Sequence, residues 1–439
     1  MSSKSESDTA CNEARSSSDN GQRSTTEALY PPDAWNIVAS TSALNTFNPI
    51  RSIVDQMKVQ PNPDYEPIKL SIGDPSIYGG FEPCVEILDC VRESLYSGKH
   101  NGYHPSHGSL EARKAVAHVH SKPNQEISPN DVILTSGCSG AIDITLRALA
   151  NPGDNVLIPT PGFSIYKTIL TACGIEAREY YLLPEKSWQV DLEHLEKQID
   201  GKTVAIVLND PSNPCGSVYS SEHKQEIIQI AGKYHKPIVA DEIYHEMVFS
   251  GHKYESVGSL AGDVPVLCCG GISKRYLVPG WRMGWIILHD RRGIMRDTVW
   301  PRMVAMTQVI LGPCSIVQGA LHEILLKTPS EFFQAVNKKI ESHAMLCYDC
   351  LSKVDGLKPI MPQGSIYLMV QIDIKRFPNI KDDIDFTEKL VCAMSVHCLP
   401  GQCFRYRNYF RVVICAAKEK LEEACHRIKL FCEKNYVTE

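Results

Sequence analysis

From residue 131 onward, short apolar runs alternate with longer stretches in which apolar residues recur at helical spacing. The short runs are rich in β-branched residues and end in glycine, proline or polar turns, which is typical of buried strands. Alternation of this kind indicates an α/β fold with a mostly parallel sheet covered by helices. Seven strands are predicted, at 132–135, 155–158, 177–182, 204–208, 237–240, 264–269 and 285–288.

Helices are predicted at 86–96, 139–149, 164–173 and 221–234 and through the long stretch 313–354. After residue 357 the pattern of apolar positions changes. The remainder mixes strands such as 365–370 and 410–414 with a closing helix at 418–433, which indicates a smaller α+β domain. We therefore expect a disordered tail (1–34), an N-terminal segment packing with the small domain (35–75), a large domain with a seven-stranded sheet (76–335) and the small domain (336–439).

Composition narrows the class of protein. The net charge of −6 over 439 residues provides no basic field for nucleic acid, and no apolar run approaches the length of a membrane span. The 17 cysteines are odd in number and lie within apolar runs, which favours reduced thiols over a disulfide framework. Acidic residues such as Glu6, Asp8 and Glu13 are unlike a mitochondrial presequence. We expect a cytoplasmic protein that binds neither nucleic acid nor membrane.

A lysine and an arginine occupy a glycine-rich segment between two predicted strands. Lys274 follows the strand that ends at Gly270-Gly271, and Arg282 comes eight residues later, after the turn at Pro279-Gly280. Because strand ends open into a crevice in α/β folds, an amine and a guanidinium there can converge on one small ligand. A surface loop with two cations is the alternative interpretation.

Other strands also end in polar residues. The run 132–135 ends in Ser136-Gly137-Cys138-Ser139-Gly140, a strand-to-helix turn that predicts an anion cradle or, alternatively, a simple N-cap. Asn213 lies in a loop fixed by two prolines. Asp241 closes the strand 237–240, where a buried carboxylate needs a partner.

Two further positions complete the set of candidates. Arg411 lies inside an apolar run and requires an anionic partner, which is either a structural ion pair or a ligand. Gly73 follows a predicted strand at 68–72 and allows close approach of backbone to a ligand, although a turn needs glycine equally.

Together these motifs resemble a known family. Asn213 in N-P-C-G, Asp241 in D-E-I-Y, Lys274 in S-K, Arg282 in P-G-W-R-M-G-W and Arg411 in F-R-V resemble the fold type I pyridoxal-phosphate aminotransferases over nearly all of residues 44–436. The segments L-T-S-G-C-S, P-G-F-S-I-Y-K-T and S-V-H-C-L-P are similar to those of the tyrosine aminotransferase branch of that family in animals.

The resemblance implies the cofactor pyridoxal 5′-phosphate and a role for each site residue. Lys274 would bind the cofactor covalently and carry the substrate proton, Asp241 would pair with the pyridine nitrogen, and Tyr244 would bond the ring oxygen together with Asn213, with Phe163 stacked on the ring. Gly137, Cys138, Ser139, Ser273 and Arg282 would hold the phosphate, joined by Tyr103 from the second subunit of a homodimer. Arg411, Asn213 and the backbone of Gly73 would hold the substrate.

The activity implied is transfer of an amino group between amino acids and 2-oxo acids, with L-tyrosine and 2-oxoglutarate as substrates. The alternatives are an aminotransferase for alanine, kynurenine or other substrates, a lyase acting at Cβ or Cγ, and a non-catalytic effector-binding module. Intact Lys274 disfavours the last. Cys347 and Cys350 with His343 have a metal-like spacing, but without a second pair we interpret them as buried helix residues and expect no metal.

Overall fold

The computed structural model describes residues 37–57 and 59–438. The predicted disordered tail, 1–34, lies outside the described residues. The chain divides into two units, Met1–Ser40 and Thr41–Glu439. All helices and strands of the described residues lie in the second unit.

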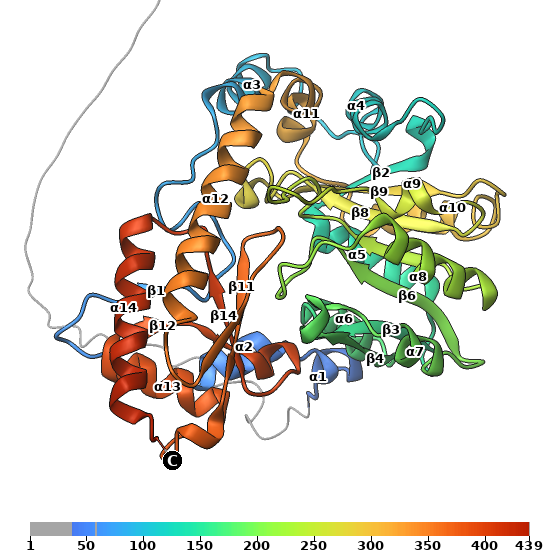
Figure 1. Cartoon of the computed structure of the whole chain (residues 1–439). Helices are drawn as coiled ribbons and strands as arrows, with labels where there is room; N and C mark the ends of the chain where they lie inside the picture. Colours follow the sequence, from blue (N-terminus) through green and yellow to red (C-terminus); the bar gives the residue numbers. More distant parts are fainter. Residues whose placement is uncertain (1–36, 58, 439) are drawn as a thin grey trace, which may run out of the picture. The chain divides into compact units, whose positions relative to one another are not determined.

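The second unit contains an eight-stranded mixed sheet in the order β2-β9-β8-β7-β6-β3-β4-β5 (Figure 1). Neighbouring strands run parallel from β4 through β3, β6 and β7 to β8, whereas β9 is antiparallel to β8 and β2. The strands are β2 (Val132–Ser136), β3 (Asn155–Thr160), β4 (Glu176–Leu183), β5 (Gln189–Val190), β6 (Thr203–Asn209), β7 (Ile238–Asp241), β8 (Val266–Gly271) and β9 (Met283–His289).

The seven predicted strands are confirmed. The predicted count of seven was wrong, because the sheet contains an eighth strand, β5. This edge strand has two residues and pairs antiparallel with β4. A two-residue strand is too short to show any periodicity in the sequence, so it could not be predicted from the pattern.

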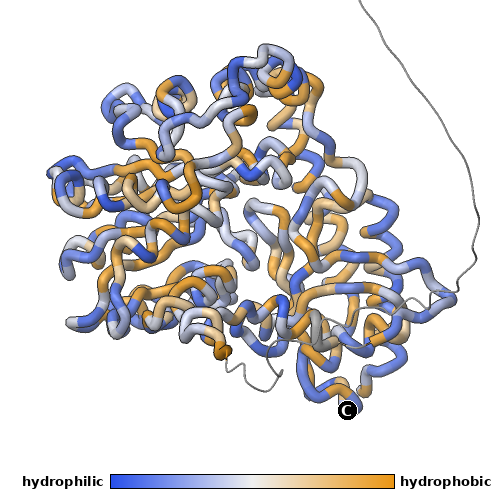
Figure 2. Tube along the Cα trace, turned by 180° about the vertical axis from the view of Figure 1, so that it is seen from behind, coloured by the Kyte–Doolittle hydropathy of each residue, from blue (hydrophilic) through white to orange (hydrophobic). Residues whose placement is uncertain are grey.

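Both faces of the sheet are buried. Along β7, Val239 packs in one hydrophobic cluster while its neighbours Ile238 and Ala240 pack in the other. Successive strand side chains point to opposite faces, so a sheet covered on both sides needs apolar residues at nearly every position. This requirement explains the continuous apolar runs. Figure 2 shows hydrophilic positions gathered on outward-facing helices and turns.

Helices flank the large sheet. They are α3 (Val85–Tyr96), α4 (Leu110–His120), α5 (Gly137–Leu149), α6 (Ile165–Ala172), α7 (Leu192–Lys197), α8 (Ser221–Lys233), α9 (Val257–Leu260), α10 (Trp300–Met306) and α11 (Ser315–Lys327). The long helical stretch predicted over 313–354 is two helices, α11 and α12 (Ser330–Leu351). Pro329 separates them because proline lacks an N–H donor and restricts the residue before it.

A second, antiparallel sheet has the order β10-β11-β14-β13. Its strands are β10 (Leu357–Ile360), β11 (Tyr367–Ile372), β13 (Leu399–Pro400) and β14 (Tyr409–Val413), and α13 (Asp383–Met394) and α14 (Lys418–Asn435) lie beside them. These elements correspond to the predicted strands 365–370 and 410–414 and to the predicted closing helix.

The segment before residue 75 adds to this smaller sheet region. It contains α1 (Thr41–Asn45), α2 (Pro49–Gln56) and β1 (Ile68–Lys69). The strand β1 pairs in parallel with β12 (Val396–His397), and the carbonyl of Leu70 accepts a hydrogen bond from the backbone N–H of Val413. The predicted strand 68–72 is therefore shorter than expected. Within 37–57 and 59–438, every helix is too short or too polar to cross a membrane.

Candidate active site

A cavity of about 400 Å³ lies where the carboxyl ends of β7 and β8 face β14 and α2. Residues from both sheets and from the N-terminal segment line it, so its wall is assembled from parts of the chain far apart in sequence. The predicted site residues that line it are Gly73, Cys138, Ser139, Phe163, Asn213, Asp241, Tyr244, Ser273, Lys274, Arg282 and Arg411.

Asp241, the last residue of β7, is 2% exposed and forms part of the cavity wall. One carboxylate oxygen accepts a hydrogen bond of 2.6 Å from the Tyr166 hydroxyl, and the other accepts from the backbone N–H of Ile243 at 3.3 Å. Burial raises the pKa of Asp241, while the hydrogen bond from Tyr166 lowers it. The carboxylate is thus held in a fixed orientation, and a cationic N–H donor in the cavity would compensate its burial.

Lys274 extends into the cavity from the segment after β8. Its Nζ donates a hydrogen bond of 2.5 Å to the carbonyl oxygen of Gly73, on the opposite wall. A side chain at Gly73 is excluded because its Cβ would lie 2.0 Å from the Tyr367 hydroxyl oxygen. Glycine at this position therefore lets the backbone of the N-terminal segment approach the lysine amine.

The N-terminus of α5 forms an anion cradle together with Arg282. Gly137 begins the helix with φ +70°, and a Cβ there would lie 2.3 Å from the Arg282 Nη2 atom. Ser136, the N-cap, makes no side-chain capping hydrogen bond, so the first-turn N–H groups remain available to a ligand. Cys138, Ser139 and Ser273 line the same region. Helix dipole and guanidinium both favour an anion here.

Arg411, on β14, is 3% exposed and lines the other end of the cavity. Its guanidinium donates to the Asn213 side-chain oxygen at 2.8 Å and to the Ser71 carbonyl at 2.6 Å, and it lies over the rings of Tyr367 and Phe404 at 4.2 and 4.8 Å. Among the described residues no carboxylate pairs with it, and its Nε has no partner. The structural ion pair that the sequence analysis considered for Arg411 is therefore not found among the described residues. The guanidinium remains able to bind an anionic ligand.

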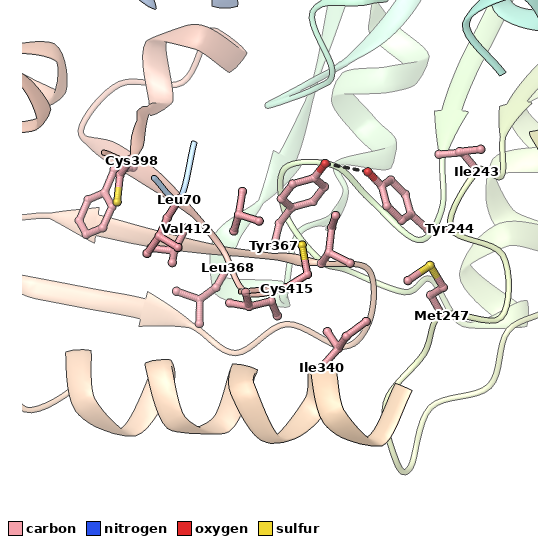
Figure 3. Close-up of a cluster of buried hydrophobic side chains, with 14 of the residues drawn as sticks. Leu70, Ile243, Tyr244, Met247, Ile340, Tyr367, Leu368, Cys398, Val412 and Cys415 are labelled. Carbon is pink, nitrogen blue, oxygen red and sulfur yellow. Dashed lines mark hydrogen bonds between the residues drawn. The ribbon is translucent and has the colours of Figure 1, made fainter. Parts of the chain in front are cut away.

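The sequence analysis missed two tyrosines at the site: Tyr367 lines the cavity, whereas Tyr166 is fully buried and reaches the site through Asp241. Tyr166 holds Asp241, and the Tyr367 hydroxyl oxygen lies 2.7 Å from that of Tyr244 (Figure 3). Tyr166 belongs to the P-G-F-S-I-Y segment already singled out, but no local signal links it to a carboxylate 75 residues away. Tyr367 is the first residue of β11, and the sequence alone does not distinguish it from any other aromatic residue of a strand.

Tyr103 does not line the cavity within one chain. It lies between α3 and α4 with 87% of its surface exposed. Among residues 37–57 and 59–438 no group of three or more His, Cys, Asp or Glu side chains is arranged to hold a metal ion. Cys347 and Cys350 lie on α12, where Cys347 is buried as expected but Cys350 is exposed, so the expected burial of Cys350 is wrong. His343 is buried, and its Nδ1 is 3.1 Å from the carbonyl oxygen of Ile414.

A lysine, a buried carboxylate, an anion cradle and an arginine without a carboxylate partner among the described residues line one cavity, as the resemblance to the aminotransferases implied. Residues 65–428 match the family described as aminotransferase class I and II, and the chain belongs to that family. Its members are dependent on pyridoxal 5′-phosphate.

Individual relatives narrow the comparison. The chain is 52% identical over 402 residues to tyrosine aminotransferase of Mus musculus, covering 92% of this chain and 88% of that protein. The crystal structure of tyrosine aminotransferase from Leishmania infantum superposes with a TM-score of 0.88 at 35% identity, covering 92% of this chain and all of that chain. An S-alkyl-thiohydroximate lyase of Arabidopsis thaliana is 38% identical, covering 84% of this chain and 80% of that protein.

The cavity residues fit the cofactor of the family. Pyridoxal 5′-phosphate carries a phosphate dianion, a pyridine nitrogen, a ring oxygen and an aldehyde. The chain offers an uncapped helix N-terminus with Arg282, a buried carboxylate at Asp241, a hydroxyl at Tyr244 and an amine at Lys274. Each chemical group of the cofactor therefore has a complementary side chain in one cavity.

Proposed function

We propose that this aminotransferase transfers the amino group of L-tyrosine to 2-oxoglutarate, giving 4-hydroxyphenylpyruvate and L-glutamate. The observation that carries the proposal is the single cavity in which Lys274 and Asp241 lie between two guanidinium groups, those of Arg282 and Arg411. The choice of tyrosine rests on two relatives named tyrosine aminotransferase: the Mus musculus protein, 52% identical to this chain, and the Leishmania infantum protein, whose structure superposes with a TM-score of 0.88.

When bound, pyridoxal 5′-phosphate supplies an electron sink for the charge that develops at the substrate Cα. Asp241 would hold the proton of the pyridine nitrogen, since its carboxylate is fixed by Tyr166 and buried. Tyr244 and Asn213 would donate hydrogen bonds to the ring oxygen. The Asn213 amide has this capacity because its oxygen is already occupied by Arg411 and its NH₂ group remains free to donate. Phe163 covers one ring face.

Lys274 carries the proton. Its Nζ would hold the cofactor and, as a free amine, would take the proton from the substrate Cα. Ser273, Arg282 and the first-turn N–H groups of Gly137, Cys138 and Ser139 would hold the cofactor phosphate and so keep the reacting atoms beside the lysine.

Arg411 binds the substrate α-carboxylate bidentately, with help from the backbone N–H of Gly73. This role uses the guanidinium of Arg411, which is already oriented by Asn213 and by the ring of Tyr367. Arg51, on α2, also lines the cavity. Its charge favours an acceptor with a second carboxylate, as in 2-oxoglutarate.

The helix α2 covers the substrate together with the small domain, 336–439, which we take as a unit that closes on the large domain, 76–335. Asn48, the N-cap of α2, accepts a hydrogen bond from the Ser164 hydroxyl at 3.3 Å, while Ile53 and Val54 pack against the cluster that contains Phe404. Closure would exclude water from the reaction.

The active form is a homodimer with shared sites, in which Tyr103 of each chain completes the phosphate site of the other. Tyr103 is exposed, as are Val309 and Ile310, 82% and 69% exposed, on a neighbouring loop. The two loops are joined by a 2.9 Å hydrogen bond from Thr307 to Ser106. This exposed apolar patch fits a second copy of the chain. A cytoplasmic location agrees with the sixteen free cysteines of the described residues.

The proposal is tested by measuring glutamate formation from 2-oxoglutarate with a panel of amino donors. We expect the highest kcat/KM for L-tyrosine, at least about tenfold above L-alanine, since each unit of about 1.4 kcal/mol in differential transition-state binding gives a factor of ten. Preference for alanine or kynurenine would retain the family and reject the substrate. Release of ammonia and a cleaved side chain, without glutamate, would favour the lyase.

A further inference from the structure

Tyr367 lies at the junction of the two sheets. It is the first residue of β11, is 2% exposed, and contributes to the wall of the cavity. Its side chain reaches from the smaller sheet toward Tyr244, which follows β7 of the large sheet, and Figure 3 shows the two hydroxyl groups directed at one another. The same ring lies beneath the guanidinium of Arg411, from the neighbouring strand β14.

The hydroxyl of Tyr367 has little freedom. Its oxygen lies 2.7 Å from the Tyr244 oxygen, and its neighbour on the other side is Gly73, where even a Cβ would be 2.0 Å away. The ring is held by the edge-to-face contact with Tyr244, at 5.7 Å between centroids and an interplanar angle of 79°. The hydroxyl therefore has a defined position relative to Tyr244.

The direction of this hydrogen bond follows from the number of protons. A phenol has one O–H and so donates once. If Tyr244 donates to the cofactor ring oxygen, as the proposed function requires, the bond between the tyrosines must be donated by Tyr367. Burial raises the pKa of Tyr244 well above its usual range, so Tyr244 stays protonated and can act as that donor.

The ring of Tyr367 has a separate partner. The Arg411 guanidinium carbon is 4.2 Å from the ring centroid, a cation–π geometry, and the same guanidinium donates to Asn213 and Ser71. One side chain thus contacts both the group proposed to bind the substrate carboxylate and the group proposed to bind the cofactor oxygen.

We infer that Tyr367 is a positioning residue with two separable parts: its hydroxyl donates to Tyr244 and strengthens the hydrogen bond that Tyr244 gives to the cofactor, and its ring orients Arg411 for the substrate carboxylate. This inference rests on the proposed roles of Tyr244 and Arg411. A phenol that accepts one hydrogen bond becomes a stronger donor in the next, because hydrogen bonds in a chain polarise one another.

The test uses the holoenzyme and the pH titration of its visible absorption band, which reports the proton on the linkage between Lys274 and the cofactor. A weaker donor at Tyr244 stabilises the anionic ring oxygen less and makes that linkage a weaker acid. Tyr367→Phe is therefore expected to raise the pH midpoint, corresponding to an acid constant about 2- to 10-fold smaller, the size of one hydrogen bond. Because the ring remains, KM for tyrosine should change less than about twofold.

Tyr367→Leu removes the ring as well. It should reproduce the shift of the band and in addition raise KM for tyrosine about 2- to 30-fold, the range of a cation–π contact. Tyr180→Phe is the matched control, since Tyr180 is a fully buried phenol that donates to the Val207 carbonyl at 2.7 Å and does not line the cavity. Tyr180→Phe should leave both the pH midpoint of the visible band and KM for tyrosine unchanged.

Tyr244→Phe separates failure of this inference from failure of the proposed function. If Tyr244→Phe shifts the band but Tyr367→Phe does not, the inference is wrong and the proposed function stands. If neither shifts it, the role of Tyr244 itself is wrong. In the double variant Tyr244→Phe/Tyr367→Phe the shift should equal that of Tyr244→Phe alone, and additive shifts would overturn the inferred chain of hydrogen bonds.

Discussion

The two walls of the cavity are built differently. The wall from the large sheet places Asp241 directly at the end of β7 and Lys274 three residues after β8, where the central parallel strands fix them. The opposite wall comes from α2, the segment around Gly73 and β14, and it depends on contacts between residues hundreds of positions apart. In the proposed function, proton transfer belongs to the first wall and recognition of the substrate belongs mainly to the second.

This comparison implies that substitutions in the first wall act on kcat and substitutions in the second act on KM. The walls meet where Lys274 donates to Gly73 and where Tyr367 contacts Tyr244. At those meeting points the effect depends on which atoms are removed, as with the hydroxyl and the ring of Tyr367.

The largest effect is expected for Lys274→Ala. Loss of the group that takes the Cα proton should lower kcat by about 10⁴-fold or more, while the protein still folds and binds cofactor without a covalent link. The change of absorbance in a single turnover with L-tyrosine measures the loss of catalysis, and a thermal melt measures whether the variant folds. Steady-state transamination near the wild-type rate would remove Lys274 from the proposed role.

Arg411→Ala tests the second wall. Truncating a buried group that pairs with a charged ligand costs about 2–5 kcal/mol, so KM for every α-amino acid should rise about 30- to 5,000-fold while cofactor affinity changes little. Arg282→Ala is the matched variant and should weaken cofactor binding instead. An unchanged KM for Arg411→Ala would place the carboxylate elsewhere.

Arg51→Ala sharpens the comparison within the second wall. Since Arg51 is exposed at the cavity, its effect should be modest and sensitive to salt, raising KM for 2-oxoglutarate about 2- to 5-fold and leaving KM for tyrosine unchanged. Initial rates at low and high ionic strength measure this. Equal changes in both KM values would show that Arg51 does not distinguish the two substrates.

The smallest effect is expected for Asn48→Ala. The Asn48 side chain caps α2 by accepting from the N–H of Ile50 at 3.0 Å, and loss of such a cap costs about 1 kcal/mol. Hydrogen exchange of α2 should accelerate about fivefold, with little change in the overall melting temperature. Ser164→Ala, which removes a hydroxyl that also donates to the Asn48 side chain, should have a weaker effect on the helix. Unchanged exchange in Asn48→Ala would mean that α2 is held by its apolar contacts alone.

The sequence predicted the first wall well because its signals are local. A buried strand followed at once by Asp241, or by a glycine-rich segment with Lys274, is visible within a dozen residues. Arg411 was also predicted, since an arginine inside an apolar strand is conspicuous. The chain order of these motifs, together with the resemblance, was enough to predict the α/β fold.

The parts that could not be predicted depend on long-range contacts or very short elements. Nothing near Tyr367 indicates that its hydroxyl meets Tyr244, 123 residues away, and nothing near Tyr166 indicates its bond to Asp241. The strand β5 is two residues long, and it and the tyrosine contacts come from packing between elements, which a periodicity does not contain. The division of 313–354 into two helices is a different case, because Pro329 is a local signal that the sequence analysis overlooked.

The central claim is that this cavity transfers the amino group of tyrosine through Lys274. It is tested most directly by the visible spectrum of the holoenzyme before and after addition of L-tyrosine without an oxo acid. The account predicts that the band of the Lys274-bound cofactor is lost with tyrosine, is retained with alanine, and returns when 2-oxoglutarate is added. A band that persists with tyrosine, or no band after addition of pyridoxal 5′-phosphate, would contradict it.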